Sequence, residues 1–402
     1  MNVPINDIPV IFPDLFPDNY INNVLGWGIP ENELHSKLPD GTHKFLSLDI
    51  DFGLRCSLHC PHCFQKNQNS YDFKKSLSWE NTLKVIDEAK ELGLKYVKIL
   101  GAGEPFEDRN FLRFLVELDK RDIHTAIFTK GHVLGSDKLV EKIFGDQGFN
   151  TCKELIHFLY KIKTSILLGF NSFNREMQNF FVGMKPSDNL YNYPALRDNA
   201  INLLTEAGFN KYIPNVPTRL AIVPAPFKPE NISEIFDIYK WGRIRNIYVS
   251  ACPTTSSGYG NSELERETSL NFSSYLNEVK KLYVDIYVWA IQKKIVSIED
   301  FMKHGVSLYP GAHPCNQVAC GFYVRLDGSV YLCPGNDSSA FLVEKDVRNS
   351  SLHDIWLSSK NYRLAKSDAF NFQCIARKKT FFKDYPKFYI DVYNEVIKEI
   401  SK

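Results

Sequence analysis

Strand-like and helix-like segments alternate along the first 250 residues, and this alternation constrains the fold most strongly. Phe45–Asp51 (FLSLDID) alternates apolar and polar residues as a strand does, and Leu77–Gly93 begins with the N-cap residue Ser78 and ends in glycine. We predict strands at 45–51, 96–100, 125–129, 165–170, 219–223 and 246–251, and helices at 77–93, 110–120, 151–161, 194–207 and 230–241. This order predicts a parallel α/β sheet, open or curled toward a partial barrel, with its chemistry at the carboxyl ends of the strands.

The remaining segments have a different character. Residues 1–44 contain six scattered prolines and predict an extended arm that lies over a domain. A long helical pattern covers 265–292, a hairpin with Asp327 and Gly328 at its turn covers 322–332, and a closing helix covers 387–400. We therefore predict four units: an arm at 1–44, a barrel at 45–262, a helical connector at 263–310, and a C-terminal α+β domain at 311–402.

Composition excludes several classes of protein. The 402 residues include 48 Lys and Arg and 47 Asp and Glu, so the net charge is +1 and gives no field for a nucleic-acid partner. No apolar stretch is long enough to span a membrane, and residues 1–9 lack the features of a signal peptide, so we expect a cytoplasmic protein with no membrane partner. In a reducing compartment, the nine cysteines are more typical of metal binding or catalysis than of disulfides.

Three of these cysteines lie within eight residues, directly after the first predicted strand. Cys56, Cys60 and Cys63 follow the pattern Cys-x3-Cys-x2-Cys. Structural zinc sites use four ligands, usually as two separated pairs, so this triplet suits zinc poorly. It suits a four-iron cluster in which one iron has no protein ligand and can bind a small molecule. The alternative is three cysteines packed as small apolar side chains.

The run RCSLHCPHCFQ, followed by a helix and by a second strand that ends in Gly101-Ala102-Gly103-Glu104-Pro105, resembles the radical S-adenosylmethionine (radical SAM) enzymes. The resemblance implies a partial (β/α)6 TIM-like barrel. It also implies that the three cysteines ligate three irons of a [4Fe-4S] cluster, while the fourth iron chelates the amino and carboxylate groups of S-adenosylmethionine (SAM).

The same resemblance implies a set of SAM-binding residues. His62 stands where the family usually has an aromatic residue beside the adenine, and Asn171 stands where the family has an acid that meets the ribose, with Gly169 in place of a serine. Thr129-Lys130-Gly131 stands where the family often has Thr-Asn-Gly. The implied SAM contacts are His62, Ala102, Gly103, Glu104, Pro105, Thr129 and Asn171.

A second group of cysteines flanks the predicted hairpin. Cys320 and Cys333 stand on either side of the Asp327–Gly328 turn, so the hairpin brings their sulfurs toward one metal centre. The stretch 312–376 resembles the SPASM/Twitch extension of radical SAM enzymes, including its Ser-Leu-x-x-Ile-Trp helix. That resemblance implies one auxiliary [4Fe-4S] cluster held by Cys315, Cys320, Cys333 and Cys374. A four-cysteine zinc site is the alternative.

The two remaining cysteines stand alone. Cys152 falls within a helical pattern, which is typical of a core residue. Cys252 ends the sixth predicted strand and is therefore a candidate hydrogen-atom donor to a substrate radical, as an epimerase requires. A buried free cysteine without a catalytic role is the alternative.

The resemblance to radical SAM enzymes implies an oxidoreductase that reductively cleaves SAM to a 5′-deoxyadenosyl radical and abstracts a hydrogen atom from a substrate C–H bond. Flavodoxin or ferredoxin is the expected reductant. The expected reaction is a two-electron oxidation or rearrangement of a small molecule in natural-product biosynthesis.

Two other functions compete with this one. A maturase of ribosomally made peptides, which forms a cross-link, a thioether or an epimerised residue, is the first alternative. It is less favoured because such enzymes often carry an N-terminal winged-helix domain, for which residues 1–44 are too few. A non-catalytic electron carrier or a zinc-held interaction module is the second alternative, and it leaves the Gly-Glu-Pro strand end unexplained.

Overall fold

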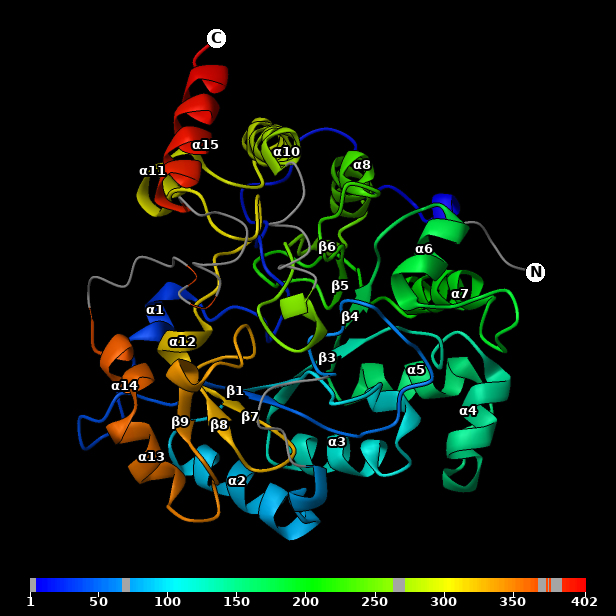
Figure 1. The fold of residues 1–402 in the computed structure, drawn as a ribbon, viewed down its shortest axis with the longest axis vertical. Coiled ribbons are helices and arrows are strands. Elements are labelled where there is room, and N and C mark those ends of the chain that lie inside the picture. Colours follow the sequence, from blue (N-terminus) through cyan, green and yellow to red (C-terminus); the bar gives the residue numbers. More distant parts are fainter. Residues whose placement is uncertain (1–4, 67–72, 263–271, 368–373, 375, 377–384) are drawn as a thin grey trace.

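The computed structural model describes residues 5–66, 73–262, 272–367, 374, 376 and 385–402, and a nine-stranded sheet forms its centre (Figure 1). The sheet order is β6-β5-β4-β3-β2-β1-β7-β8-β9. Neighbours from β6 to β7 are parallel, whereas β8 and β9 are antiparallel. The strands are β1 (Ser47–Ile50), β2 (Tyr96–Ile99), β3 (His124–Thr129), β4 (Ser165–Gly169), β5 (Leu220–Val223), β6 (Tyr248–Val249), β7 (Tyr323–Val324), β8 (Val330–Tyr331) and β9 (Leu342–Glu344). Because β6 and β9 remain edges, the sheet does not close, and the predicted partial barrel is confirmed.

Helices alternate with the first six strands as the sequence predicts. They are α2 (Trp79–Glu91), α3 (Phe111–Lys120), α4 (Asp137–Phe144), α5 (Cys152–Lys161), α6 (Arg175–Val182), α7 (Tyr193–Glu206) and α8 (Ile232–Arg243). The Ser78 hydroxyl caps α2 by accepting a hydrogen bond from the Asn81 amide, and Thr151 caps α5 in a capping box with Glu154. The short helices α4 and α6 are additional to those predicted. None of the described helices has the length and apolar character of a membrane span.

Strand side chains divide between an outer and an inner core. Leu48 and Ile50 of β1 pack outward into the core beneath the helices. Successive strand residues point to opposite faces, so the other positions face the interior of the barrel. There Ala126, Leu167 and Ala221 form a separate apolar cluster. The interior is therefore lined mostly by small and apolar side chains.

The N-terminal arm packs at the amino end of the barrel. Apart from the short helix α1 (Glu31–Leu34) and one 3-10 turn, the described part of residues 5–44 has no helix or strand. Val24 forms a parallel bridge with Thr218, just before β5, and joins the inner apolar cluster. The Trp27 ring lies 5.5 Å from the Phe128 ring. These contacts place the arm beneath the interior of the barrel.

The C-terminal part is joined to the same sheet. Its helices are α10 (Phe272–Gln292), α11 (Ile298–His304), α12 (Gln317–Cys320), α13 (Leu352–Ser358), α14 (Lys360–Ala365) and α15 (Tyr385–Ile400). The β7–β8 hairpin confirms the hairpin predicted at 322–332, and β7 also pairs with β1. Helix α10 packs against α8 and α15 (Figure 1). The residues at 265–271, where the long predicted helix begins, lie outside the described residues, and the predicted division at 262 and 310 stays a prediction.

Trp356 of α13 fixes the C-terminal part to the chain that enters β1. Its side chain is fully buried, its Nε1 donates to the His43 carbonyl at 2.9 Å, and its ring meets Phe45 edge-on at 5.1 Å. We predict that Trp356→Ala lowers the free energy of unfolding by about 3–5 kcal/mol through the lost packing. The neighbouring Leu357 is 37% exposed, so Leu357→Ala should cost less than about 1 kcal/mol. Urea titration of both variants tests this, and equal midpoints would contradict it.

Candidate functional site

The loop after β1, which carries the first three cysteines, is held by the loop that follows β2. The Gly103 amide donates to the Gly53 carbonyl at 2.8 Å, and the Glu104 amide donates to the Arg55 carbonyl at 2.7 Å. A Cβ atom on Gly103 would lie 2.1 Å from the Arg55 carbonyl oxygen, closer than any side chain tolerates. The glycine at 103 is therefore required for the two loops to meet.

Two further segments hold the same cysteine loop. The His59 amide donates to the carbonyl of Val182, the last residue of α6, at 3.0 Å. The Cys63 carbonyl accepts from the Tyr259 amide at 3.0 Å. The loop thus has backbone partners from the ends of β2 and α6 and from the segment after β6, which fix its path without regular secondary structure.

Glu107 anchors the loop through a side chain. Its carboxylate accepts from the Ser57 amide and hydroxyl, each at 2.9 Å, and bonds His132 Nε2 at 2.8 Å. Burial alone would raise the pKa of Glu107, but the hydrogen bonds from His132 and Ser57 lower it below its usual value. Glu107 was not among the predicted site residues.

The two predicted groups of cysteines meet in one cavity of about 270 Å³ at the carboxyl ends of the strands. Its wall contains seven cysteines: Cys56, Cys60, Cys63, Cys252, Cys315, Cys333 and Cys374. Cys320, at the end of α12, does not line the cavity. It is fully buried, and its Sγ donates to the Gln317 carbonyl at 3.5 Å.

The burial of the thiols determines their protonation state and therefore which metal groups they can bind. Burial raises the pKa of Cys56 and of Cys320 to about 12 and that of Cys315 to about 11. Such thiols stay protonated unless a metal replaces the proton, and thiolate sulfur is the usual ligand of iron–sulfur clusters. The donor set in the cavity therefore fits iron–sulfur ligation. Among the described residues, no three His, Cys, Asp or Glu side chains form a ligand set for one metal ion. In a cluster, each thiolate binds its own iron.

Most of the predicted SAM contacts also line the cavity. They are His62, Ala102, Gly103, Glu104 and Thr129. Pro105 is buried as the first residue of a 3-10 turn and is not part of the cavity wall. Asn171 is also buried outside the wall, and its Oδ1 accepts from the Ala225 amide at 2.8 Å. The roles of these residues stay predictions.

Glu104 connects two strand ends. Its Oε1 accepts from the Thr129 hydroxyl, and its Oε2 accepts from the Lys130 amide at 2.8 Å. Burial raises the pKa of Glu104, and these hydrogen bonds oppose the rise. The carboxylate thus ties the loop after β2 to the end of β3.

His62 is a neutral ring in the cavity wall. Burial, together with the positive charges of Lys130 and Lys228, holds its pKa well below the usual value. Its ring meets Phe181 edge-on, with centroids 5.9 Å apart. A neutral, flat ring at this position is compatible with the predicted contact to an adenine.

A charged pair in the same cavity was missed by the sequence analysis. Asp49 of β1 and Lys98 of β2 are register partners, and Lys98 Nζ lies 3.6 Å from Asp49 Oδ1. Lys98 Nζ also donates to Gln317 Oε1 at 2.5 Å. Asp49 Oδ1 has no hydrogen-bond partner in the described part of the chain, and burial raises the pKa of Asp49 to about 6 against the effect of Lys98. The sequence feature that could have indicated this pair is a charged residue, in each of the two strands, at a position that faces the interior of the barrel.

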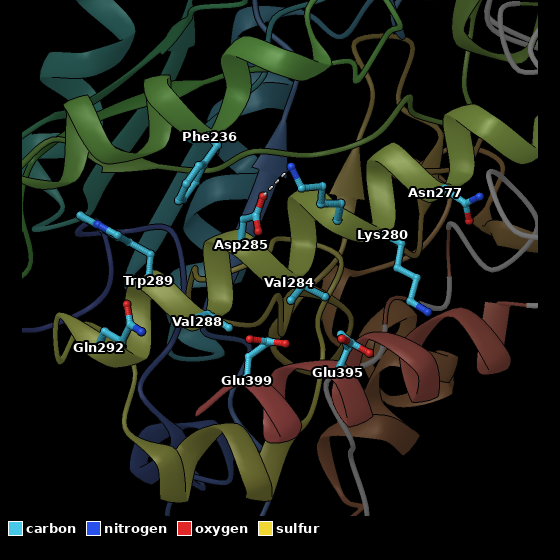
Figure 2. Close-up of a pocket in the computed structure, with 11 residues that line it drawn as sticks. Phe236, Asn277, Lys280, Val284, Asp285, Val288, Trp289, Gln292, Glu395 and Glu399 are labelled. Atoms are coloured by element: carbon cyan, nitrogen blue, oxygen red, sulfur yellow. Dashed lines mark ion pairs between the residues drawn. The ribbon is translucent and has the colours of Figure 1, made fainter. Parts of the chain in front are cut away.

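A larger hollow of about 500 Å³ lies outside the barrel, between α8, α10 and α15 (Figure 2). Phe236, Trp289 and Glu395 are among the residues that line it, and Lys281 forms an ion pair with Asp285 at 3.9 Å. None of the cysteines or predicted contacts that the structure describes lies in its wall. The chemistry therefore belongs to the smaller cavity.

Comparisons with known proteins identify the domain. A family model described as the radical SAM superfamily matches residues 50–242. None of the curated proteins matches the chain. A solved structure of anSMEcpe with bound AdoMet (SAM) aligns with 13% identity and a TM-score of 0.55, over 89% of this chain and 99% of that one. This similarity shows a shared fold.

Streptococcus suis SuiB bound to its precursor peptide SuiA aligns with 16% identity and a TM-score of 0.45. That alignment covers 80% of this chain and 66% of the SuiB chain. The matched segment contains the cysteine triplet, the Gly-Ala-Gly-Glu-Pro loop and the carboxyl ends of β2 to β5. The chain therefore contains a domain of the radical SAM superfamily, which runs from the end of β1 into α8.

Proposed function

We propose that this protein is a radical SAM enzyme that oxidises a substrate by two electrons after abstracting a hydrogen atom from one of its C–H bonds. The observation that carries the proposal is the single cavity whose wall includes both groups of cysteines and the loop after β2. Supporting it, the family match covers residues 50–242, which contain the cysteine triplet and β2 to β5. Resemblance to that family implies a SAM ligand and a [4Fe-4S] cluster.

The residues assigned to cofactor binding follow from their places in the cavity wall. Cys56, Cys60 and Cys63 would hold the SAM-binding cluster, and the backbone from Ala102 to Glu104 would face the methionine part of SAM. The chemistry that these cofactors supply when bound is reductive cleavage of SAM, which yields a radical able to remove a hydrogen atom from carbon. The chain itself contributes a mostly apolar enclosure that excludes water from that radical.

The C-terminal cysteines would hold an auxiliary cluster that accepts the second electron. Cys315, Cys333 and Cys374 line the cavity, and Cys320 is buried at the end of α12, outside the cavity wall. Four thiolates leave no open iron, which suits electron transfer better than substrate binding. Cys252 lies in the same wall and is the candidate hydrogen-atom donor for the competing outcome, epimerisation.

We assign the Asp49–Lys98 pair to the substrate. Both side chains line the cavity that also holds the two groups of cysteines, and Asp49 Oδ1 is a buried acceptor without a hydrogen-bond partner in the described part of the chain. Lys98 retains donor capacity beyond its bond to Gln317. A substrate group that both donates and accepts hydrogen bonds, a hydroxyl or an amide, would complement the pair.

A small molecule and a peptide both offer such groups. A specific observation supports the peptide as a second candidate: an anSMEcpe structure holds AdoMet and the Kp18Cys peptide, and this chain aligns over 99% of it with a TM-score of 0.56. Because that alignment has 13% identity, it supports a shared fold and not a shared substrate. We therefore keep the small molecule as the first candidate.

We predict that the anaerobically reconstituted and reduced protein releases 5′-deoxyadenosine and methionine from SAM alone, at a slow uncoupled rate. Cys60→Ala should abolish this release because it removes a cluster ligand. Cys152→Ala should retain it, because Cys152 is the first residue of α5 and is buried in the outer core. Chromatography of the products measures both. Release of S-adenosylhomocysteine instead would indicate methyl transfer and contradict hydrogen abstraction.

Metal analysis tests the number of clusters separately. We predict about eight irons and eight sulfides per chain from two four-iron clusters. Replacing Cys56, Cys60 and Cys63 together with alanine should leave about four irons, and Cys333→Ala should remove the other cluster instead. One cluster accompanied by zinc in the intact protein would overturn the auxiliary assignment.

Stability measurements test whether the Asp49–Lys98 pair serves the substrate or the fold. Lys98→Met alone should destabilise the protein by about 3–5 kcal/mol because it leaves a buried carboxylate unpaired. Asp49→Leu combined with Lys98→Met should recover most of this loss, since Ser47 still donates to Gln317 Oε1. Urea titration measures both variants. A double variant as unstable as Lys98→Met would assign the pair to the fold and contradict a substrate role.

A further inference from the structure

A short segment after β6, residues 256–261, holds the end of the first cysteine loop, and we call it the bridging segment. Its Tyr259 amide donates to the Cys63 carbonyl at 3.0 Å. Its Ser257 hydroxyl donates to the Phe64 carbonyl at 2.9 Å. The bridging segment therefore binds the chain at the third cysteine and at the residue that follows it.

Gly258 brings the bridging segment directly against the cysteine loop. A Cβ atom built on Gly258 would lie 2.3 Å from the Lys66 carbonyl oxygen and 2.5 Å from the Phe64 carbonyl oxygen, closer than real side chains approach. The φ angle of Gly258 is +55°, in the left-handed region that favours glycine. Because the two backbones are in contact here, a shift of the bridging segment also moves the end of the cysteine loop.

Asp337 connects the bridging segment with the second group of cysteines. This residue stands four positions after Cys333 and is buried. Its carboxylate accepts from the Gly258 amide at 3.2 Å and from Asn261 Nδ2 at 3.1 Å. Its own amide donates to the Ser256 carbonyl at 3.4 Å. Asp337 thus holds the bridging segment near both of its ends and at its middle.

The neighbouring Asn336 extends this connection to the last cysteine. Asn336 forms a parallel bridge with Ser256, and its Nδ2 donates to the Ala376 carbonyl at 3.0 Å. Ala376 stands two positions after Cys374. One hydrogen-bond network therefore runs from the chain beside Cys333 and Cys374, through the bridging segment, to the first cysteine loop.

We propose that Asp337 is a positioning residue that couples the two groups of cysteines through the bridging segment. The order of the chain around Cys333 then sets the position of the loop that carries Cys63. The inference rests on the proposed function, because it takes both groups as cluster ligands and SAM as the ligand of the first cluster. A carboxylate suits this role because it accepts several hydrogen bonds at once. Loss of the auxiliary cluster therefore weakens SAM binding through the protein chain.

The test measures equilibrium binding of SAM to the anaerobically reconstituted protein, together with its iron content. Asp337→Ala should weaken SAM binding about 10-fold and leave about eight irons, because it removes hydrogen bonds and no cluster ligand. Asp337→Asn keeps one acceptor oxygen and should cause a smaller loss. Asp327→Ala is the matched control and should leave SAM binding unchanged. Asp327 is also buried, but its Oδ1 accepts from the Ser329 amide and hydroxyl, within the hairpin turn.

A double variant separates this coupling from a structural role. Cys333→Ala should weaken SAM binding about 10-fold when Asp337 is present and should have little further effect in the Asp337→Ala background, because both changes act through one connection. An equal loss in the two backgrounds would show that the auxiliary cluster acts through its charge and would contradict the inference.

Three other outcomes would also count against it. Unchanged SAM binding in Asp337→Ala would refute the inference alone. Loss of iron from Asp337→Ala, with unchanged SAM binding in Asn261→Ala, would assign Asp337 to the fold and refute the inference as well. Wild-type protein that carries iron but binds no SAM would refute the proposed function and this inference with it.

Discussion

The hydrogen bonds from the loop after β2 to the cysteine loop are the contacts on which the site depends. The amides of Gly103 and Glu104 reach the carbonyls of Gly53 and Arg55, so the loop that carries three thiols is fixed by backbone atoms. Backbone contacts of this kind fix the Cα positions of the three cysteines, and each sulfur is then placed by the rotamer of its own side chain. They also explain why the same short stretch contributes both to the cavity wall and to the shape of the cysteine loop.

Much of the fold follows from local pattern. Alternating strands and helices predicted the parallel order from β1 to β6, because a parallel sheet needs a crossover between successive strands. The turn residues Asp327 and Gly328 predicted the β7–β8 hairpin. The pairing of β7 with β1 could not be predicted in this way, since it joins residues more than 270 positions apart through backbone atoms that carry no sequence signature.

The candidate site also has a part that local sequence pattern predicts and a part that it does not. Cysteine spacing and the Gly-Glu-Pro loop indicated most of the cavity wall, because metal ligation demands particular residues at particular intervals. Asp49 and Lys98 were not identified, because a single charged residue in a strand gives no indication of its partner. Their significance depends on the register of β1 against β2, which places the two side chains opposite each other.

The position of β1 in the sheet determines the distance between the two groups of cysteines. On one side its carboxyl end leads into the first cysteines, and on the other side it pairs with β7, which begins three residues after Cys320. The spacing between the two groups of thiols is therefore governed by the register of Asp49 against Tyr323. Insertions and deletions in the surface connections can accumulate during evolution without changing that spacing, whereas a one-residue slip between these two strands would change it at once.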